Sequence, residues 1–274
     1  MKKKLFIAGA IVLTLAIFVM SPLWPYVRSL AAMKVFSTYN ERESLMAEKG
    51  IEIEIPGGGA TAEQDWYPFV LTFSADERFA LSCGDSKARL TIMYNFPAFD
   101  LSAGCSLIFD EESPYYNSFY GAYVAEGKLG FAEDGSFEAE QASLVPRFDM
   151  KELVLEDMGM PSSDFVFDWQ LTAQEEDLTL AGFDGWSRVD ADMVVNGVLH
   201  TAVSNYRNYI QYGRPGYEAE ADFAPVSMKG RVYARYFAEQ DVSIYFYIMV
   251  RSAEVLEACD REIIAQSEIT FSDK

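Results

Sequence analysis

Carboxylates are the most plentiful reactive side chains in this sequence, with 42 Asp and Glu among 274 residues. Asp110, Glu111 and Glu112 form an acidic triplet just before a group of aromatic residues, namely Tyr115, Tyr116, Phe119, Tyr120 and Tyr123. A glycosidase needs two carboxyl groups that flank the scissile bond, one of them with a raised pKa. The triplet and the tyrosines therefore give one hypothesis, a glycan-binding or glycan-hydrolysing site. The alternative is a solvated turn followed by aromatic residues that pack a β-sheet core.

Acidic clusters of this kind can also bind calcium through their oxygen atoms. Two candidates are the triplet Asp110, Glu111 and Glu112 and the more dispersed group Asp184, Asp190 and Asp192. Neither follows the spacing of an EF-hand loop. The second group alternates along a predicted strand, which places Asp190 and Asp192 on one exposed face. We therefore expect no cofactor, with a structural calcium ion as the alternative.

The sequence lacks the motifs of the commonest hydrolytic, metal and phosphate sites. His200 is the only histidine, so neither a histidine metal cluster nor an HExxH motif can form. No G-x-S-x-G elbow or S-x-x-K motif occurs. Gly57-Gly58-Gly59 lacks the Lys-Ser or Lys-Thr of a phosphate-binding loop. These features predict a protein that is not an enzyme.

A second aromatic and basic cluster lies between positions 206 and 217. Tyrosine and arginine are the residue types that dominate the energetic centres of protein interfaces. The cluster predicts a binding patch for a protein or glycan partner and consists of Tyr206, Arg207, Tyr209, Tyr212, Arg214 and Tyr217. The alternative is a set of ordinary exposed tyrosines.

Three cysteines are present, and two of them are close enough in sequence to connect adjacent strands. The predicted disulfide joins Cys83 to Cys105 and would contribute about 3 kcal/mol by the loop-entropy relation. Cys259 falls on the apolar face of a predicted helix, which is typical of a buried free thiol.

The distribution of charge separates the first 50 residues from the rest. The net charge is −20, but residues 1–50 carry 7 basic and 3 acidic side chains. Residues 51–274 therefore have a net charge of −24. Because nucleic-acid affinity comes largely from Lys and Arg on phosphates, this charge argues against a nucleic-acid partner. It also argues against the acidic domain lying flat on an anionic lipid surface.

The N-terminus has the pattern of a membrane anchor. Lys2, Lys3 and Lys4 precede an uncharged run from Leu5 to Val27, which is long enough to span the hydrocarbon core as a helix. The lysines predict a cytoplasmic N-terminus and an extracytoplasmic remainder. The alternative is a signal peptide cleaved near Ser29-Leu30-Ala31, which would release a secreted protein.

Beyond residues 1–28, the patterns predict a juxtamembrane helix over 29–50, with Asn40 as a cap and Gly50 as a stop. An aromatic-rich antiparallel β region follows over 51–150, beginning with alternation from Ile51 to Ile55. The strands expected in this region are Tyr67–Ser74, Arg78–Cys83, Arg89–Asn95, Cys105–Phe109, Phe119–Ala125, Lys128–Ala132 and Phe137–Ala139.

Residues 151–274 predict a further α+β region, and 51–274 could form one domain. Strands are expected over Lys151–Glu156, Asp164–Leu171 and Leu178–Phe183. Two hairpins are expected, one at Asn196-Gly197 and one joining Arg231–Phe237 to the central strand Val242–Val250. An amphipathic helix over Ser252–Ala265 and a last strand at Ile269 and Phe271 complete a β-rich α+β fold with antiparallel sheets.

Several short motifs in residues 160–274 resemble the PsbP-like α+β fold. They are Gly182-Phe183-Asp184-Gly185-Trp186, the Asn-Gly pair, the late amphipathic helix and Ser267-Glu268-Ile269-Thr270-Phe271. The resemblance implies an antiparallel sheet with helices packed on it, in extracytoplasmic proteins that mostly lack known catalysis. It leaves residues 51–150 unexplained.

Together these patterns predict a membrane-anchored, non-catalytic binding or accessory module of the cell envelope. Two other classes stay open. One is a carboxylate-dependent glycan-binding or glycan-hydrolysing protein, and the other is an adhesive domain stabilised by calcium.

Overall fold

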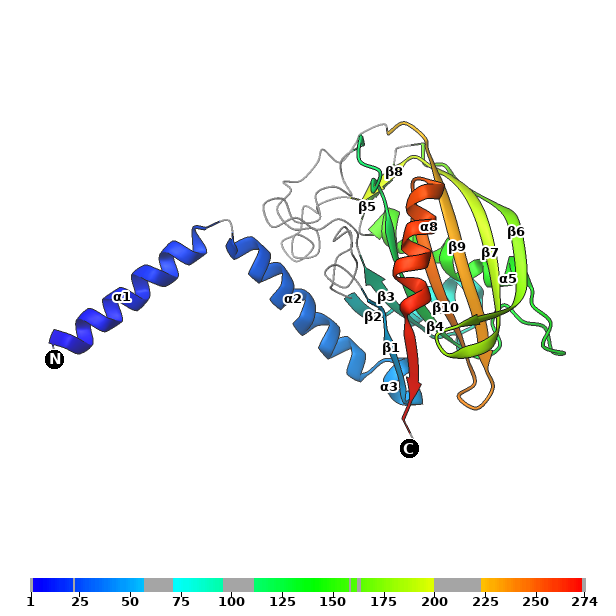
Figure 1. The fold of residues 1–274 in the computed structure, drawn as a ribbon, viewed down its shortest axis with the longest axis horizontal. Helices are drawn as coiled ribbons and strands as arrows, with labels where there is room; N and C mark the ends of the chain where they lie inside the picture. The colour runs from blue at the N-terminus through cyan, green and yellow to red at the C-terminus, as the bar shows by residue number, and fades with distance from the viewer. Residues whose placement is uncertain are drawn as a thin grey trace.

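A single antiparallel sheet of seven strands forms the centre of the molecule, in the order β2-β3-β4-β10-β9-β7-β6 (Figure 1). The computed structural model describes residues 2–21, 23–56, 71–95, 111–157, 159–161, 164–199 and 223–272. The seven strands are β2 (Leu71–Ser74), β3 (Leu90–Asn95), β4 (Phe119–Glu126), β6 (Phe167–Leu180), β7 (Phe183–Val195), β9 (Val226–Phe237) and β10 (Val242–Val250). Both predicted regions contribute strands to this sheet, and the β-rich α+β class is confirmed.

An anchor helix over residues 1–28 and a second helix over 29–50 were predicted, but the boundary between the first two helices falls earlier, at residues 20–22. α1 spans Lys2–Val19 and α2 spans Leu23–Arg42, so the run from Leu5 to Val27 is divided between them. The hydroxyl of Ser21 donates to the carbonyl of Phe18 and closes α1. Among the described helices, none is both long enough and apolar enough to cross a membrane.

α2 lies along the edge strand β2. The hydroxyl of buried Ser37 accepts a hydrogen bond from the backbone N–H of Thr72 at 3.0 Å, a partner on the side of β2 where no described strand pairs with it. α3 (Leu45–Lys49) follows after a break, and its N-cap is Ser44 rather than the predicted Asn40. Asn40 instead donates back to the carbonyl of Phe36 within α2. Gly50, with φ of 66°, ends α3 as predicted.

The middle of the sheet follows the sequence prediction closely. Every residue of β10 is buried, because β4 and β9 flank it and helices cover both of its faces. The β9–β10 hairpin places Val242 opposite Phe237, and Asp241 takes a positive φ of 53° in the turn.

The β6–β7 hairpin turns at Ala181 and Gly182, which both have positive φ, as the tight turns of twisted hairpins require. The hairpin predicted at Asn196-Gly197 is wrong. β8 (Gly197–Leu199) pairs instead with β5 (Gly159–Pro161). The Asn196 side chain accepts from the N–H of Val166 and donates to the carbonyl of Asp164, so it holds the start of β6 rather than a turn.

Helical elements cover both faces of the sheet. α8 (Ala253–Glu262) lies in front of it in Figure 1, beside the two-stranded pair of β1 (Ile51–Glu54) and β11 (Glu268–Phe271). Ser252 caps α8 by accepting from the N–H of Val255, as its sequence predicted. The helix ends at Glu262 and continues as a 3₁₀ turn, Ile264–Gln266. The opposite face carries α4 (Asp76–Cys83), α5 (Ala139–Ala142), α6 (Leu144–Phe148) and a π-helix, η3 (Asp149–Asp157).

Three predicted strands on that opposite face are wrong. Arg78–Cys83 is helical, and the Gly84 turn is the left-handed end of α4. Lys151–Glu156 belongs to the π-helix, where three consecutive residues from Leu153 to Leu155 are buried, which an alternating strand with one buried face would not allow. Lys128–Ala132 forms turns with one bridge between Phe131 and Phe137.

Candidate functional site

The aromatic residues predicted to stack a glycan are mostly part of the core. Tyr120 lies on β4 and is fully buried, and Tyr116 is buried beneath the guanidinium of Arg251. Tyr115 is partly buried against the core on the α8 face. Glu111 and Glu112 are exposed in a turn. Packing against the sheet removes Tyr116 and Tyr120 from solvent, which agrees with the alternative that these aromatic residues belong to the core.

Several predicted residues lie outside the described part of the chain. They are Asp110 of the acidic triplet, Cys105 of the proposed disulfide, His200, and the whole patch of Tyr206, Arg207, Tyr209, Tyr212, Arg214 and Tyr217. Cys83 is a free, exposed thiol at the end of α4 rather than on a strand. The disulfide with Cys105 stays a prediction.

Asp184, Asp190 and Asp192 each have a separate partner instead of converging on one point, and two of the three pair with basic side chains. Asp190 accepts two hydrogen bonds from Arg231 at 2.8 and 3.0 Å, and Asp192 pairs with Lys229 at 2.6 Å. Asp184 accepts from the hydroxyl of Thr179. Across the described ranges, no group of three or more Asp, Glu, His or Cys side chains is arranged to hold a metal ion.

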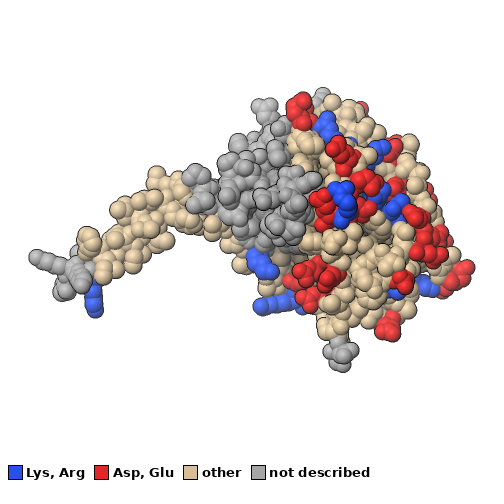
Figure 2. Space-filling model, viewed as in Figure 1, with Lys and Arg blue, Asp and Glu red and all other residues tan. Residues whose placement is uncertain are grey.

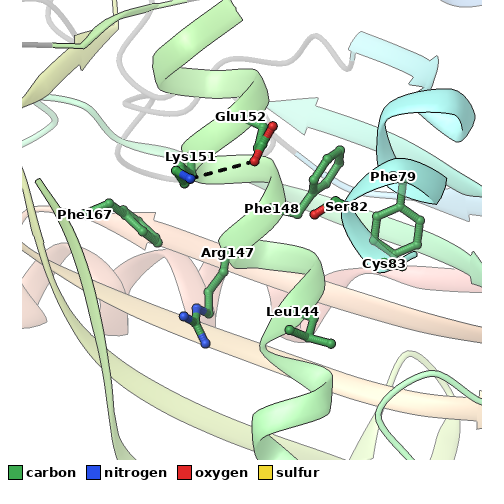
Figure 3. Close-up of a pocket in the computed structure, with 9 residues that line it drawn as sticks. All are labelled: Phe79, Ser82, Cys83, Leu144, Arg147, Phe148, Lys151, Glu152 and Phe167. Atoms are coloured by element: carbon green, nitrogen blue, oxygen red, sulfur yellow. Dashed lines mark ion pairs between the residues drawn. The ribbon is translucent and has the colours of Figure 1, made fainter. Parts of the chain in front are cut away.

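A pocket of about 290 Å³ opens where α4, α6, the π-helix and β6 meet (Figure 3). At about 30 Å³ per molecule, that volume holds roughly ten waters. Its apolar lining comes from Phe79 of α4, Leu144 and Phe148 of α6, and Phe167 of β6. Polar lining comes from Ser82, Cys83, Arg147, Lys151 and Glu152. The pocket therefore combines aromatic surface with charged groups, the composition that ligand sites share.

Two basic side chains lie on one side of this pocket. Arg147 and Lys151 are four residues apart on the continuous segment of α6 and the π-helix, and both lie on the same side of it as Phe167 (Figure 3). Lys151 is 3.9 Å from Glu152, a weak contact between exposed groups. The guanidinium of Arg147 makes no hydrogen bond or ion pair with any described residue, although the domain is strongly acidic. Its guanidinium is thus available to a carboxylate or phosphate of a ligand.

Cys83 lies at the pocket margin, but its environment does not favour nucleophilic chemistry. Burial raises the pKa of the Cys83 thiol, and the nearby carboxylate of Asp85 raises it further. The raised pKa keeps the Cys83 thiol protonated at neutral pH. Because the thiolate is the reactive form, Cys83 contributes a soft, weakly polar surface rather than a nucleophile.

The π-helix that lines the pocket also carries a buried carboxyl group, Asp149, on its inner side. Asp149 accepts hydrogen bonds from the hydroxyl of Tyr123 at 2.5 Å and from that of Tyr94. Tyr247 stacks on Tyr123 with ring centroids 4.2 Å apart. Burial raises the pKa of Asp149 to about 7, while the two tyrosine hydrogen bonds oppose that rise. π-helical segments occur often at functional sites, and here one segment connects the pocket to this polar cluster in the core.

The pocket was missed by the sequence analysis, and a partial signal for it was present. Arg147 and Lys151 are spaced four residues apart beside the apolar run Leu153–Leu155, a pattern of a helix with a basic side. Because a strand was predicted over Lys151–Glu156, the helical spacing of Arg147 and Lys151 was not recognised. Arg147 is of interest because its guanidinium has no counter-ion among the described residues, and the sequence alone does not show which charged side chains pair.

We compared the chain with known proteins and found no match: no protein-family model, no curated protein and no solved structure is similar to it. The PsbP-like resemblance of residues 160–274 thus stays a hypothesis based on its short motifs.

Proposed function

We propose that this chain is a membrane-tethered, extracytoplasmic binding module without catalytic activity, and that its pocket between α4 and α6 takes a small amphipathic anion. The observation that carries the proposal is Arg147, a cation without a counter-ion in the described structure, at the edge of a phenylalanine-lined pocket. An apolar group of the ligand would contact Phe79, Phe148 and Phe167. Its carboxylate or phosphate would accept hydrogen bonds from Arg147 and Lys151.

The tether is supported by the composition of α1. Three lysines form its first turn, and beyond them its exposed side chains are apolar around the helix, including Phe6, Ile7, Ile11, Val12, Leu13, Leu15 and Ile17. A helix that is hydrophobic on every side is buried either in protein or in lipid, and no described part of the domain covers these residues. The lysines favour the cytoplasmic side for the N-terminus and hence an extracytoplasmic domain.

Binding is favoured over catalysis by the state of the two reactive groups near the pocket. Cys83 is held as a thiol. Asp149 is fully buried, and its hydrogen-bond partners among the described residues are tyrosine hydroxyls, whereas glycoside hydrolysis requires a second carboxyl group.

The proposal is tested by measuring ligand binding to the full chain in nanodiscs by calorimetry. Octanoate is a suitable probe because its size, about ten non-hydrogen atoms, matches a pocket whose volume holds roughly ten waters. Octanol serves as its neutral counterpart. We expect octanoate to bind more tightly than octanol. We also expect Arg147→Gln to weaken octanoate binding about tenfold or more, because it removes a hydrogen bond between charged groups.

The matched control is Lys87→Gln, which removes an exposed positive charge from the same acidic domain at a residue outside the pocket. It should leave octanoate binding unchanged. If octanoate and octanol bind equally, or if Lys87→Gln weakens binding as much as Arg147→Gln, the pocket is not an anion site.

A further inference from the structure

α2 presents an apolar stripe that no described part of the protein covers. Val27, Ala31, Val35 and Tyr39 recur every four residues, so they share one side of the helix, and all four are exposed. The exposed fractions of Val35 and Tyr39 are 70% and 66%. Ser37, which bonds to β2, lies about half a turn away from Val35, on the opposite side. The stripe therefore points away from the domain.

Basic side chains accompany this stripe. Arg42 falls in line with it by helical spacing, and Lys34 lies at its border. Both are exposed, and neither side chain forms a hydrogen bond or an ion pair with a described residue. Figure 2 shows basic groups beside the C-terminal half of α2, whereas acidic side chains prevail over the rest of the visible face. α2 thus differs in charge from the domain that it supports.

We infer that the outer face of α2 lies on the anionic headgroups of the membrane that holds α1. An apolar stripe with an aromatic residue and with Lys and Arg nearby is the pattern of a helix that lies in a membrane interface. α1 ends three residues before α2 begins, so the face is necessarily close to the bilayer when α1 is inserted. This inference rests on the proposed tether, and it adds a second membrane contact that fixes how the domain is oriented.

A second copy of the chain is a poorer occupant of the same face. Two copies held in one membrane are parallel, and a two-fold axis along α2 would bring each Arg42 against its counterpart. Like charges in contact oppose pairing, whereas anionic headgroups attract both Arg42 and Lys34. Charge complementarity therefore favours lipid.

The test places an environment-sensitive fluorophore on the full chain. In a Cys83→Ser, Cys105→Ser background, the fluorophore is attached to Val35→Cys or, as the matched control, to Glu254→Cys on exposed α8. The protein is reconstituted into phosphatidylcholine vesicles with or without phosphatidylglycerol, and quenching by headgroup nitroxide lipids is measured. We expect residue 35 to be quenched at least about twofold more than residue 254. Lys34→Gln with Arg42→Gln should lower the quenching at residue 35 in the anionic vesicles.

The outcomes separate this inference from the proposed tether. If the chain floats with the vesicles but residues 35 and 254 are quenched equally, the face does not lie on lipid and the inference fails while the tether stands. A chain that does not float with vesicles contradicts the tether and the inference together. Oxidative cross-linking between two copies of Val35→Cys at a high lipid-to-protein ratio would assign the face to a second copy and overturn the inference.

Discussion

Asp149→Asn should change how the stability of the domain depends on pH. The pKa of Asp149 is raised from 3.8 to about 7 in the folded protein, mainly by burial. The folded state therefore binds more protons than the unfolded state between these values, so the free energy of unfolding falls as pH rises through that window. At 1.36 kcal/mol per pKa unit, the loss amounts to about 4 kcal/mol and is complete above pH 7.

An amide has the shape of the carboxyl group but does not titrate, so the variant lacks this loss. At pH 4, close to the ordinary pKa of 3.8, little of this loss has developed, so we expect the variant and the parent to differ by less than about 1 kcal/mol. At pH 8 the variant should be more stable than the parent by up to about 4 kcal/mol, less any cost of rearranging the tyrosine hydroxyls that donate to the carboxylate.

The assay is urea denaturation of the full chain in detergent micelles between pH 4 and pH 8. Because many other carboxyl groups titrate, the informative quantity is the difference between variant and parent at each pH. Asp134→Asn is the control: hydrogen bonds from Ser136 lower the pKa of the exposed Asp134 carboxyl, so its effect falls below pH 4. A difference for Asp149→Asn that is the same at pH 4 and pH 8 would refute the reasoning from burial.

Two further substitutions test the close packing of the sheet and its buried ion pairs. Gly121→Ala should destabilise the protein by at least about 3 kcal/mol, because the new Cβ would lie 1.8 Å from the carbonyl oxygen of Met93. Gly9→Ala, with no atom within 4 Å of its Cβ, is the control in the same thermal melts, and equal melting temperatures would contradict the prediction. Arg231→Ala should cost about 2 kcal/mol, because it leaves Asp190 and Asp260 without their common cation, whose side chain is 7% exposed. Lys229→Ala removes a more exposed pair and should cost less than about 1 kcal/mol; a larger loss there would show that burial is not what matters.

The parts of the fold that the sequence predicts well depend on neighbouring residues. β10 is a long apolar run beside a four-residue turn, and α8 has a serine cap followed by an apolar stripe, so each carries its own boundary signals. The hairpin prediction at Asn196-Gly197 failed because the Asn196 side chain bonds to residues 30 and 32 positions away. The strand prediction over Lys151–Glu156 failed for a related reason. The π-helix found there accompanies the burial of Asp149 against tyrosines of β3 and β4, and no local sequence pattern contains these contacts.

The candidate site was less predictable than the fold. The residue types after the acidic triplet are compatible with a ligand surface and with a β-sheet core, and at Tyr116 and Tyr120 tertiary packing buries the rings in the core. Arg147 stands out because the described structure gives it no counter-ion, whereas most other described arginines pair or donate to a carbonyl.

The hydrogen bond from Thr72 to Ser37 gives α2 a protective role in addition to its position. Unpaired edge strands can pair with other chains and so promote aggregation. At one edge of this sheet, α2 covers β2 and occupies a backbone donor that another strand would otherwise use. At the other edge, β6 carries irregularities in its register and a run of acidic residues, Glu175, Glu176 and Asp177, which discourage pairing. A shortened protein that begins after α2 would therefore expose β2 and should self-associate, so a soluble form of the domain needs to retain residues 23–42.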